Sequence, residues 1–150
     1  MKELQAFLKS QKILQIAPAA GDPWIANVLM ACNTPHKIYF VGSKDTLYGK
    51  KLLEDSSLAF ATAWHEENNH CNRKGIQGVG KAHFTTDHVE IEEGIRLHNK
   101  RYTEFAKRIT PDWAKSDEHA SGVWVIAPSY IKFWNDELYG DNGSKEFKDF

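Results

Sequence analysis

The sequence has few cysteines, almost no net charge and no long apolar run, and each absence excludes a class of protein. Cys32 and Cys71 are too few for a disulfide framework, so free thiols in a reducing compartment are expected. Nineteen Lys and Arg against 20 Asp and Glu give a net charge of −1, so no broad positive field attracts nucleic acid. No segment approaches the roughly 20 apolar residues of a membrane span, and the N-terminus lacks the apolar core of a signal peptide. We expect a cytoplasmic protein that binds neither nucleic acid nor membrane.

Familiar catalytic and metal-binding motifs are also missing. The chain has no Gly-x-Ser-x-Gly elbow and no Walker sequence, so hydrolase and nucleotide-triphosphatase functions have no support. His65 and His70 are five residues apart, whereas the metalloprotease helix needs a spacing of four. We therefore expect no metal site. Catalytic residues cannot be named from the sequence.

Short apolar runs separated by turn-forming residues dominate the chain. A short amphipathic helix is expected over 2–11, because Leu4, Phe7 and Leu8 share one helical face. The expected strands cover 13–17, 24–30, 37–41, 58–64, 76–84, 123–127 and 131–134, with a polar link at 66–73 and Pro128 between the last two. Two further helices are expected, one over 44–54 capped by Ser43, and one from a cap at Asp87 to just before Pro111.

The order of these elements indicates the fold class. Strands and helices do not alternate as βαβ units, so a doubly wound parallel sheet is not expected. We predict a mainly β (α+β) fold, an antiparallel split β-barrel with flanking helices. At 150 residues the chain is about the size of one domain, and we expect a single domain over 1–150 with a mobile tail after about residue 139.

The turn after the third expected strand is the most informative segment for function. The strand ends at Gly42, and the next residues supply hydroxyls from Ser43 and Thr46 and ammonium groups from Lys44, Lys50 and Lys51. Backbone N–H groups, hydroxyls and ammonium groups together suit a phosphate. The alternative is an ordinary solvated helix face, because lysines are common on amphipathic helices.

Several segments, in the correct order, resemble the FMN-binding split barrels related to pyridoxamine 5'-phosphate oxidase. They are Lys37-Ile-Tyr-Phe-Val-Gly-Ser-Lys-Asp-Thr46, Leu52-Leu-Glu-Asp-Ser-Ser-Leu-Ala-Phe60, Gly75-Ile-Gln-Gly-Val-Gly-Lys-Ala82 and Ile131-Lys-Phe-Trp134. Within that superfamily the chain is most similar to the YhbP-like (UPF0306) group, which shares the Gly-Ile/Val-Gln-x-x-Gly segment and the closing Val-Trp strand.

The resemblance implies an FMN cofactor and names residues that would hold it. The second strand would place Asn27, Val28 and Leu29 along the flavin ring, and the turn Gly42, Ser43, Lys44 and Thr46 would hold the phosphate. Trp134 matches an aromatic residue that contacts the cofactor in the oxidases, although an indole in an apolar strand is also a normal core residue. The Gln77 amide is able to pair with the polar edge of the ring, although a surface barrel position explains it equally well.

The chain also departs from the oxidase pattern. Ala26 stands where a basic residue is typical, and Leu47-Tyr48 stand where the oxidases carry Arg-Lys. Lys50 and Lys51 are the candidates to replace that pair. The substrate-binding Arg and His near the oxidase C-terminus have no counterpart in 140–144.

Three functions stay open at the level of sequence. The leading expectation is an FMN-dependent oxidoreductase acting on a small molecule that the sequence does not identify. The second is a non-catalytic protein that binds or senses flavin or haem with the same fold. The third is a barrel that has lost its affinity for a cofactor. A homodimer is expected, because a small barrel fills its own lumen and a flavin ring must lie against a second surface.

Overall fold

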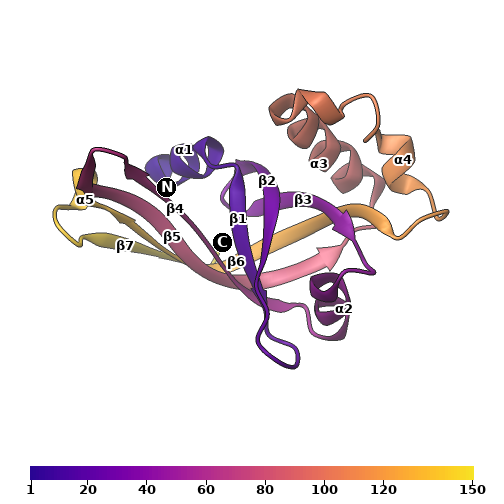
Figure 1. Cartoon of the computed structure of the whole chain (residues 1–150), viewed down its shortest axis with the longest axis horizontal. Helices are drawn as coiled ribbons and strands as arrows, with labels where there is room; N and C mark the ends of the chain where they lie inside the picture. The colour runs from indigo at the N-terminus through magenta and orange to yellow at the C-terminus, as the bar shows by residue number, and fades with distance from the viewer.

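Seven antiparallel strands form the framework of the molecule (Figure 1), and the computed structural model describes residues 1–150. The strands are β1 (Ile13–Pro18), β2 (Ala26–Thr34), β3 (Lys37–Ser43), β4 (Ser57–Glu66), β5 (Asn69–Phe84), β6 (Ser121–Asn135) and β7 (Ser144–Lys148). The helices are α1 (Lys2–Ser10), α2 (Leu47–Glu54), α3 (His88–Arg101), α4 (Pro111–Lys115) and α5 (Asp136–Tyr139), with a 3-10 turn at Thr103–Phe105.

The sheet closes into a barrel of six strands. Its order is β3-β2-β1-β4-β5-β6-β7, and a further pairing of β3 with β6 closes the ring and leaves β7 outside. The long strand β6 serves both parts, because 121–126 pair with β3 and 130–134 pair with β7. The predicted fold class, a mainly antiparallel split barrel with flanking helices, is confirmed.

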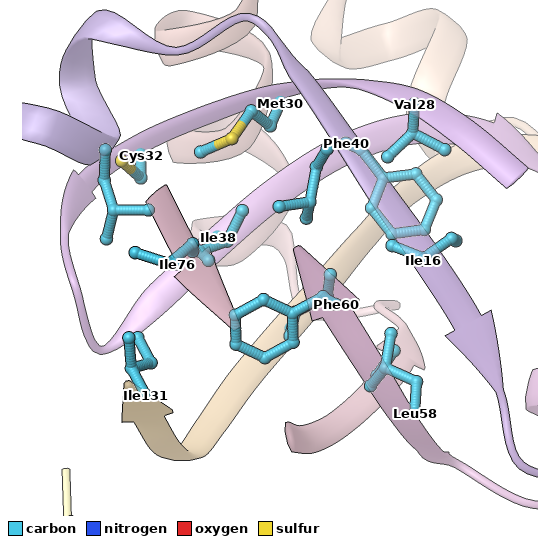
Figure 2. Packing of buried hydrophobic residues seen from close by; sticks show 14 of the residues in the cluster. Ile16, Val28, Met30, Cys32, Ile38, Phe40, Leu58, Phe60, Ile76 and Ile131 are labelled. Carbon is cyan, nitrogen blue, oxygen red and sulfur yellow. The ribbon is translucent and has the colours of Figure 1, made fainter. Parts of the chain in front are cut away.

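The barrel interior is filled by alternate side chains of its strands. Figure 2 shows residues of six strands meeting there, among them Ile16, Met30, Phe40, Phe60 and Ile76. Helix α1 adds three buried side chains to the same core, Leu4, Phe7 and Leu8. Because apolar side chains occupy the lumen, a large ligand has to bind on the outside of the barrel.

A second, smaller core covers part of that outside. Ile91 and Ile95 of α3 and Ala114 of α4 pack on Tyr39 of β3 and Val125 of β6. The outer face of β3 and of the first half of β6, at Val123 and Val125, is covered in this way. Figure 1 shows α3 and α4 side by side over this end of the barrel. Alternate residues on the outer faces of β1, β4 and β5 stay partly or fully accessible.

Two predicted helices have different limits in the structure. Helix α2 begins at Leu47 rather than 44, and its cap is Thr46, whose hydroxyl accepts the Gly49 N–H, not Ser43. Helix α3 ends at Arg101 rather than before Pro111. Its apolar stripe continues to Tyr102, but the Tyr102 backbone leaves the helix and its hydroxyl donates to the Met30 carbonyl of β2 at 2.6 Å.

The strands differ from the prediction in three places. The polar link expected over 66–73 is largely strand, because β4 and β5 continue as a hairpin through His65 and Arg73. Strands 123–127 and 131–134 are one strand, since Pro128 sits where the β5–β6 register shifts, a position that needs no ladder N–H. The segment expected to be a mobile tail contains β7, which pairs with β6.

Candidate cofactor-binding site

Cross-strand register aligns a row of polar side chains on the accessible outer face of the barrel. Gln15 of β1 pairs with Asn27 of β2 on one side and with Ala61 of β4 on the other. Ala61 pairs with Gln77 of β5, which pairs with Lys132 of β6. Directly opposite residues of an antiparallel pair point to the same face. Three amides and one ammonium group therefore lie in one line across five strands, and we call Asn27, Gln15, Gln77 and Lys132 the polar row.

An apolar row runs beside the polar row. It consists of Ala17, Ala59, Val79 and Tyr130, which pair in sequence across β1, β4, β5 and β6. Ala17, Ala59 and Val79 have small side chains, so little rises above the backbone of β1, β4 and β5 here. Val79 is 46% exposed, which is unusual for a valine in the middle of a central strand. The barrel therefore presents an apolar strip bordered by hydrogen-bonding groups.

Apart from Asn27, which lies beside it, the residues of these two rows line the floor of a groove with a volume of about 380 Å³. The groove also includes Ile25, from the loop between β1 and β2, as a wall. Its lining consists of Gln15, Ala17, Ile25, Ala59, Phe60, Ala61, Gln77, Gly78, Val79, Tyr130 and Lys132. A neighbouring hollow of about 630 Å³ shares Ala17, Ala59 and Val79 and reaches Ser57 and Lys81. Together they offer a long, flat and mostly apolar surface.

Two glycines of β5 each lie against an aromatic ring, Gly78 in the lining of the groove and Gly75 beyond it. A Cβ atom on Gly78 would lie 2.4 Å from the Phe60 ring, so only glycine fits over that buried side chain. A Cβ atom on Gly75 would lie 2.3 Å from the Trp134 ring. Trp134 therefore lies flat on the β5 backbone, two residues along β6 from Lys132 and on the same face.

The turn after β3 has a defined hydrogen-bonding pattern. The Ser43 hydroxyl accepts the Asp45 N–H at 3.1 Å and keeps its own hydrogen for a ligand. The Lys44 backbone N–H donates to the Ala120 carbonyl, and its ammonium group lies 4.7 Å from the centre of the Phe84 ring. None of the ion pairs of the molecule includes Lys44. Ser43 and Lys44 are thus available to an anion.

Two other predicted phosphate ligands, Thr46 and Lys51, have structural roles. The Thr46 hydroxyl donates to the Ser43 carbonyl and accepts the Gly49 N–H. The Lys51 ammonium group donates to the carbonyls of Ala20 at 2.8 Å and Asp22 at 2.7 Å. Lys51 therefore ties α2 to the loop that carries Ile25, the wall of the groove. Lys50 is exposed.

The predicted site residues fall into two separate groups. Asn27, Gln77 and Trp134 lie on the outer face, in or beside the groove, and Leu29 is half-buried on the same side of β2. Gly42, Ser43, Lys44, Thr46, Lys50 and Lys51 lie at and after the end of β3, and none of them lines the groove. The Val28 side chain belongs to neither group, because it is buried in the barrel core.

Sequence reasoning missed Gln15, Tyr130 and Lys132. Gln15 and Lys132 lay in predicted strands, whereas Tyr130 lay in the link expected between 123–127 and 131–134. The alternation of β1 already directed Gln15 away from the core. What was missing is the register, which pairs residues as far apart as 15 and 61 or 77 and 132. A glutamine within one strand does not indicate which residue of another strand it will pair with.

Solved structures with the same fold come from several bacteria. A heme binding protein from Mycobacterium smegmatis matches with a TM-score of 0.71 and 17% identity; the match covers 93% of this chain but 53% of that protein, so the chain spans about half its length. A putative 5-nitroimidazole antibiotic resistance protein from Bacteroides thetaiotaomicron matches with a TM-score of 0.68 and 11% identity, over 87% of this chain and 81% of that protein. A protein of the pyridoxinephosphate oxidase family from Clostridium acetobutylicum, related to general stress protein 26, matches with a TM-score of 0.66 and 13% identity. That match covers 98% of this chain and 92% of the other protein. At these identities the likeness establishes the fold alone.

Comparison with curated proteins finds no match. None of the helices combines the length with the apolar character needed to cross a bilayer. The sequence model of pyridoxamine 5'-phosphate oxidase matches residues 1–135, which contain all six barrel strands. With the split-barrel topology, this match shows that the chain belongs to the pyridoxamine 5'-phosphate oxidase family.

Proposed function

We propose that the chain binds FMN, with the isoalloxazine ring against the groove on the outer face of the barrel. The observation that carries the proposal is the polar row beside the apolar row. A flavin ring is flat and largely apolar on its faces, and its carbonyl and N–H groups lie on its edge. Such a ligand fits an apolar floor bordered by a few convergent amides. The Gln15 and Gln77 amides have the donors and acceptors that the ring edge needs.

The phosphate of FMN belongs at the turn after β3. Ser43 and Lys44 are the two side chains there with a free donor, and Lys50 and Lys81 are further exposed cations on α2 and β5. The chain has no arginine in this turn, so the charge that binds a phosphate must come from lysines, which act as point charges.

A homodimer accounts for the separation of the two groups of residues. The turn does not line the groove, so one copy of the chain offers the ring surface and the phosphate turn in different places. A second copy facing the groove would cover the ring and bring its own turn to the phosphate. A symmetric pair would build two such sites.

The chemistry we propose is electron transfer through the bound flavin to a small substrate. FMN supplies the redox step, and the protein binds, orients and shields the ring. The groove lining contains two residues with ionisable side chains, Tyr130 and Lys132. Partial burial and the neighbouring Glu146 raise the pKa of Tyr130, so its phenol stays protonated at neutral pH. We also infer that the chain groups with the YhbP-like (UPF0306) proteins, on the segment Gly75–Gly80 and the closing strand.

Titration of the purified chain with FMN tests the proposal. We expect quenching of flavin fluorescence with a dissociation constant in the micromolar range, about −8 kcal/mol. Gln77→Leu should weaken FMN and riboflavin alike, because the amide faces the ring. Lys44→Gln should weaken FMN more than riboflavin, because the ammonium group serves only the phosphate. Absence of binding at about a millimolar, roughly −4 kcal/mol, contradicts the proposal.

Haem is the second candidate ligand, because one protein of the same fold is described as heme binding. The groove has no His, Cys or Met to ligate iron, and its one phenol has a raised pKa that opposes formation of the phenolate. These features favour flavin. Haem titration monitored at the Soret band separates the two ligands, and reduction of the bound flavin by a reduced pyridine nucleotide separates an enzyme from a carrier.

A further inference from the structure

A basic pocket lies where α1, β2 and α3 meet, away from the flavin groove. Its volume is about 320 Å³, and Lys9, Lys100 and Arg101 line it together with Ala31 and Leu97. It shares no residue with the groove or with the turn after β3. Nothing in the proposed flavin function uses it.

None of the three cations of this pocket is paired with a carboxylate. The lining contains no carboxylate, and none of the ion pairs includes Lys9, Lys100 or Arg101. The nearby Cys32 thiol does not supply one. Burial raises its pKa to about 11, against the opposing effects of Arg101 and Lys9, so the thiol is neutral. Like charges held together without a counter-ion favour the binding of an anion.

Arg101 is held in place for such a role. Its Nη1 donates to the Lys9 carbonyl at 2.5 Å and joins the C-terminal ends of α1 and α3. Its Nε is buried and has no hydrogen-bond partner. Unpartnered buried donors are rare in folded proteins, and a guanidinium normally uses Nε and a terminal nitrogen together to bind a phosphate or carboxylate.

Cations in the last turn of a helix also complement the helix dipole. That role accounts for charged side chains near both helix ends, but it does not require a pocket between them or an unsatisfied buried Nε. The apolar wall of Ala31 and Leu97 is likewise unnecessary for capping. It suits a ligand that carries a small apolar group beside its charge.

We propose that this pocket binds a small phosphate monoester, with the phosphate on Arg101, Lys9 and Lys100 and its organic part on Ala31 and Leu97. A phosphate monoester is close to a dianion at neutral pH, which matches a cluster of three cations better than a monocarboxylate does. The volume limits the organic part to a small group, well below the size of FMN. The proposal is independent of flavin binding.

Calorimetric titration with phenyl phosphate and with inorganic phosphate tests it. The experiment uses the full chain carrying Lys44→Gln, which removes the ammonium group of the other proposed phosphate site. We expect saturable binding of phenyl phosphate at about a millimolar or tighter, and weaker binding of inorganic phosphate, which cannot use the apolar wall. Backbone amide resonances of Ala31 and Leu97 should shift during the titration.

Variants of the two lysines locate the binding without disturbing the fold. Lys9 and Lys100 are exposed and make no side-chain hydrogen bond, so Lys9→Gln and Lys100→Gln should fold normally, and each should weaken phenyl phosphate binding about tenfold. Lys107→Gln, an exposed lysine outside the pocket, is the matched control and should change nothing. No saturable binding below about 10 mM, roughly −2.7 kcal/mol, or an equal loss in Lys107→Gln, overturns the proposal.

Discussion

A single carboxylate, Glu90, adds polar contacts to the apolar packing that attaches the helical layer to the barrel. It accepts hydrogen bonds from Lys37 of β3 at 2.6 Å and from Thr85 at 2.8 Å, and its other near neighbour is His83 of β5 at 3.1 Å. Burial alone raises a carboxyl pKa, but these partners outweigh it and lower the pKa of Glu90 to about 2. One side chain thus fixes the start of α3 to two strands.

Glu90→Gln should therefore destabilise the protein by about 1–3 kcal/mol at pH 7. A carboxyl with a lowered pKa stabilises the fold above its unfolded pKa near 4.5, and that contribution is lost as the pH falls toward 2. The difference between wild type and variant in denaturant unfolding should shrink between pH 4.5 and 2. Glu92→Gln on the same helix removes an exposed ion pair and should cost less. Equal losses for both variants contradict this role.

Enlarging a side chain on the inner face of the sheet should reduce stability, whereas enlarging one on the outer face should reduce ligand binding. Gly78→Ala should destabilise by roughly 1–3 kcal/mol, because its Cβ would meet the buried Phe60 ring. Ala59→Val adds volume on the exposed face of the neighbouring strand, so stability should hold while FMN affinity falls. Thermal unfolding and flavin titration of both variants measure the two effects. Loss of stability in Ala59→Val would show that this face is not open.

At the scale of elements, the loop between β1 and β2 depends on Lys51. Its two hydrogen bonds to loop carbonyls hold Ile25 at the edge of the groove. Lys51→Met should loosen residues 19–25 in amide exchange and weaken FMN and riboflavin by similar factors. A selective loss for FMN would instead assign Lys51 to the phosphate. Lys44→Gln, which should weaken FMN more than riboflavin, provides the reference for a loss that is specific to the phosphate.

The sequence predicted strands better than helix ends or register. Alternation and turn residues located all six barrel strands, and the capping residue Asp87 marked the start of α3, where its side chain accepts the Glu90 N–H. The end of α3 was wrong because Tyr102 hydrogen-bonds to β2, about 70 residues earlier in the chain. Such a contact leaves no local pattern.

The same limit applies to the candidate site. The turn after β3 could be proposed from the sequence because its hydroxyls and lysines lie close together in the chain. The polar row was not, because Gln15, Gln77 and Lys132 come together only through pairing across five strands. Local patterns thus identified the groups suited to a phosphate, whereas the surface suited to a ring needed the folded sheet.

At the scale of the whole molecule, the accessible face of the barrel is the surface on which a second copy would dock. Ile25 and Val79 are 64% and 46% exposed there, beside a floor of alanines. An apolar surface of this kind is a common mark of an interaction site. The groove has no covering element from its own chain.

We predict that the chain is a homodimer of about twice 17.1 kDa, with or without FMN, and that Val79→Glu converts it to a monomer. A carboxylate in the middle of an apolar interface loses its hydration without gaining a partner. Val89→Glu is the matched control, because Val89 is 75% exposed on α3, which covers a different part of the barrel. Sedimentation velocity at micromolar concentration should show dimers for wild type and for Val89→Glu, and monomers for Val79→Glu. FMN affinity should also fall in Val79→Glu, because Val79 itself lines the groove and because the turn after β3 would no longer reach a ring held on the partner. A monomeric wild type that binds FMN at micromolar concentration would refute the shared site.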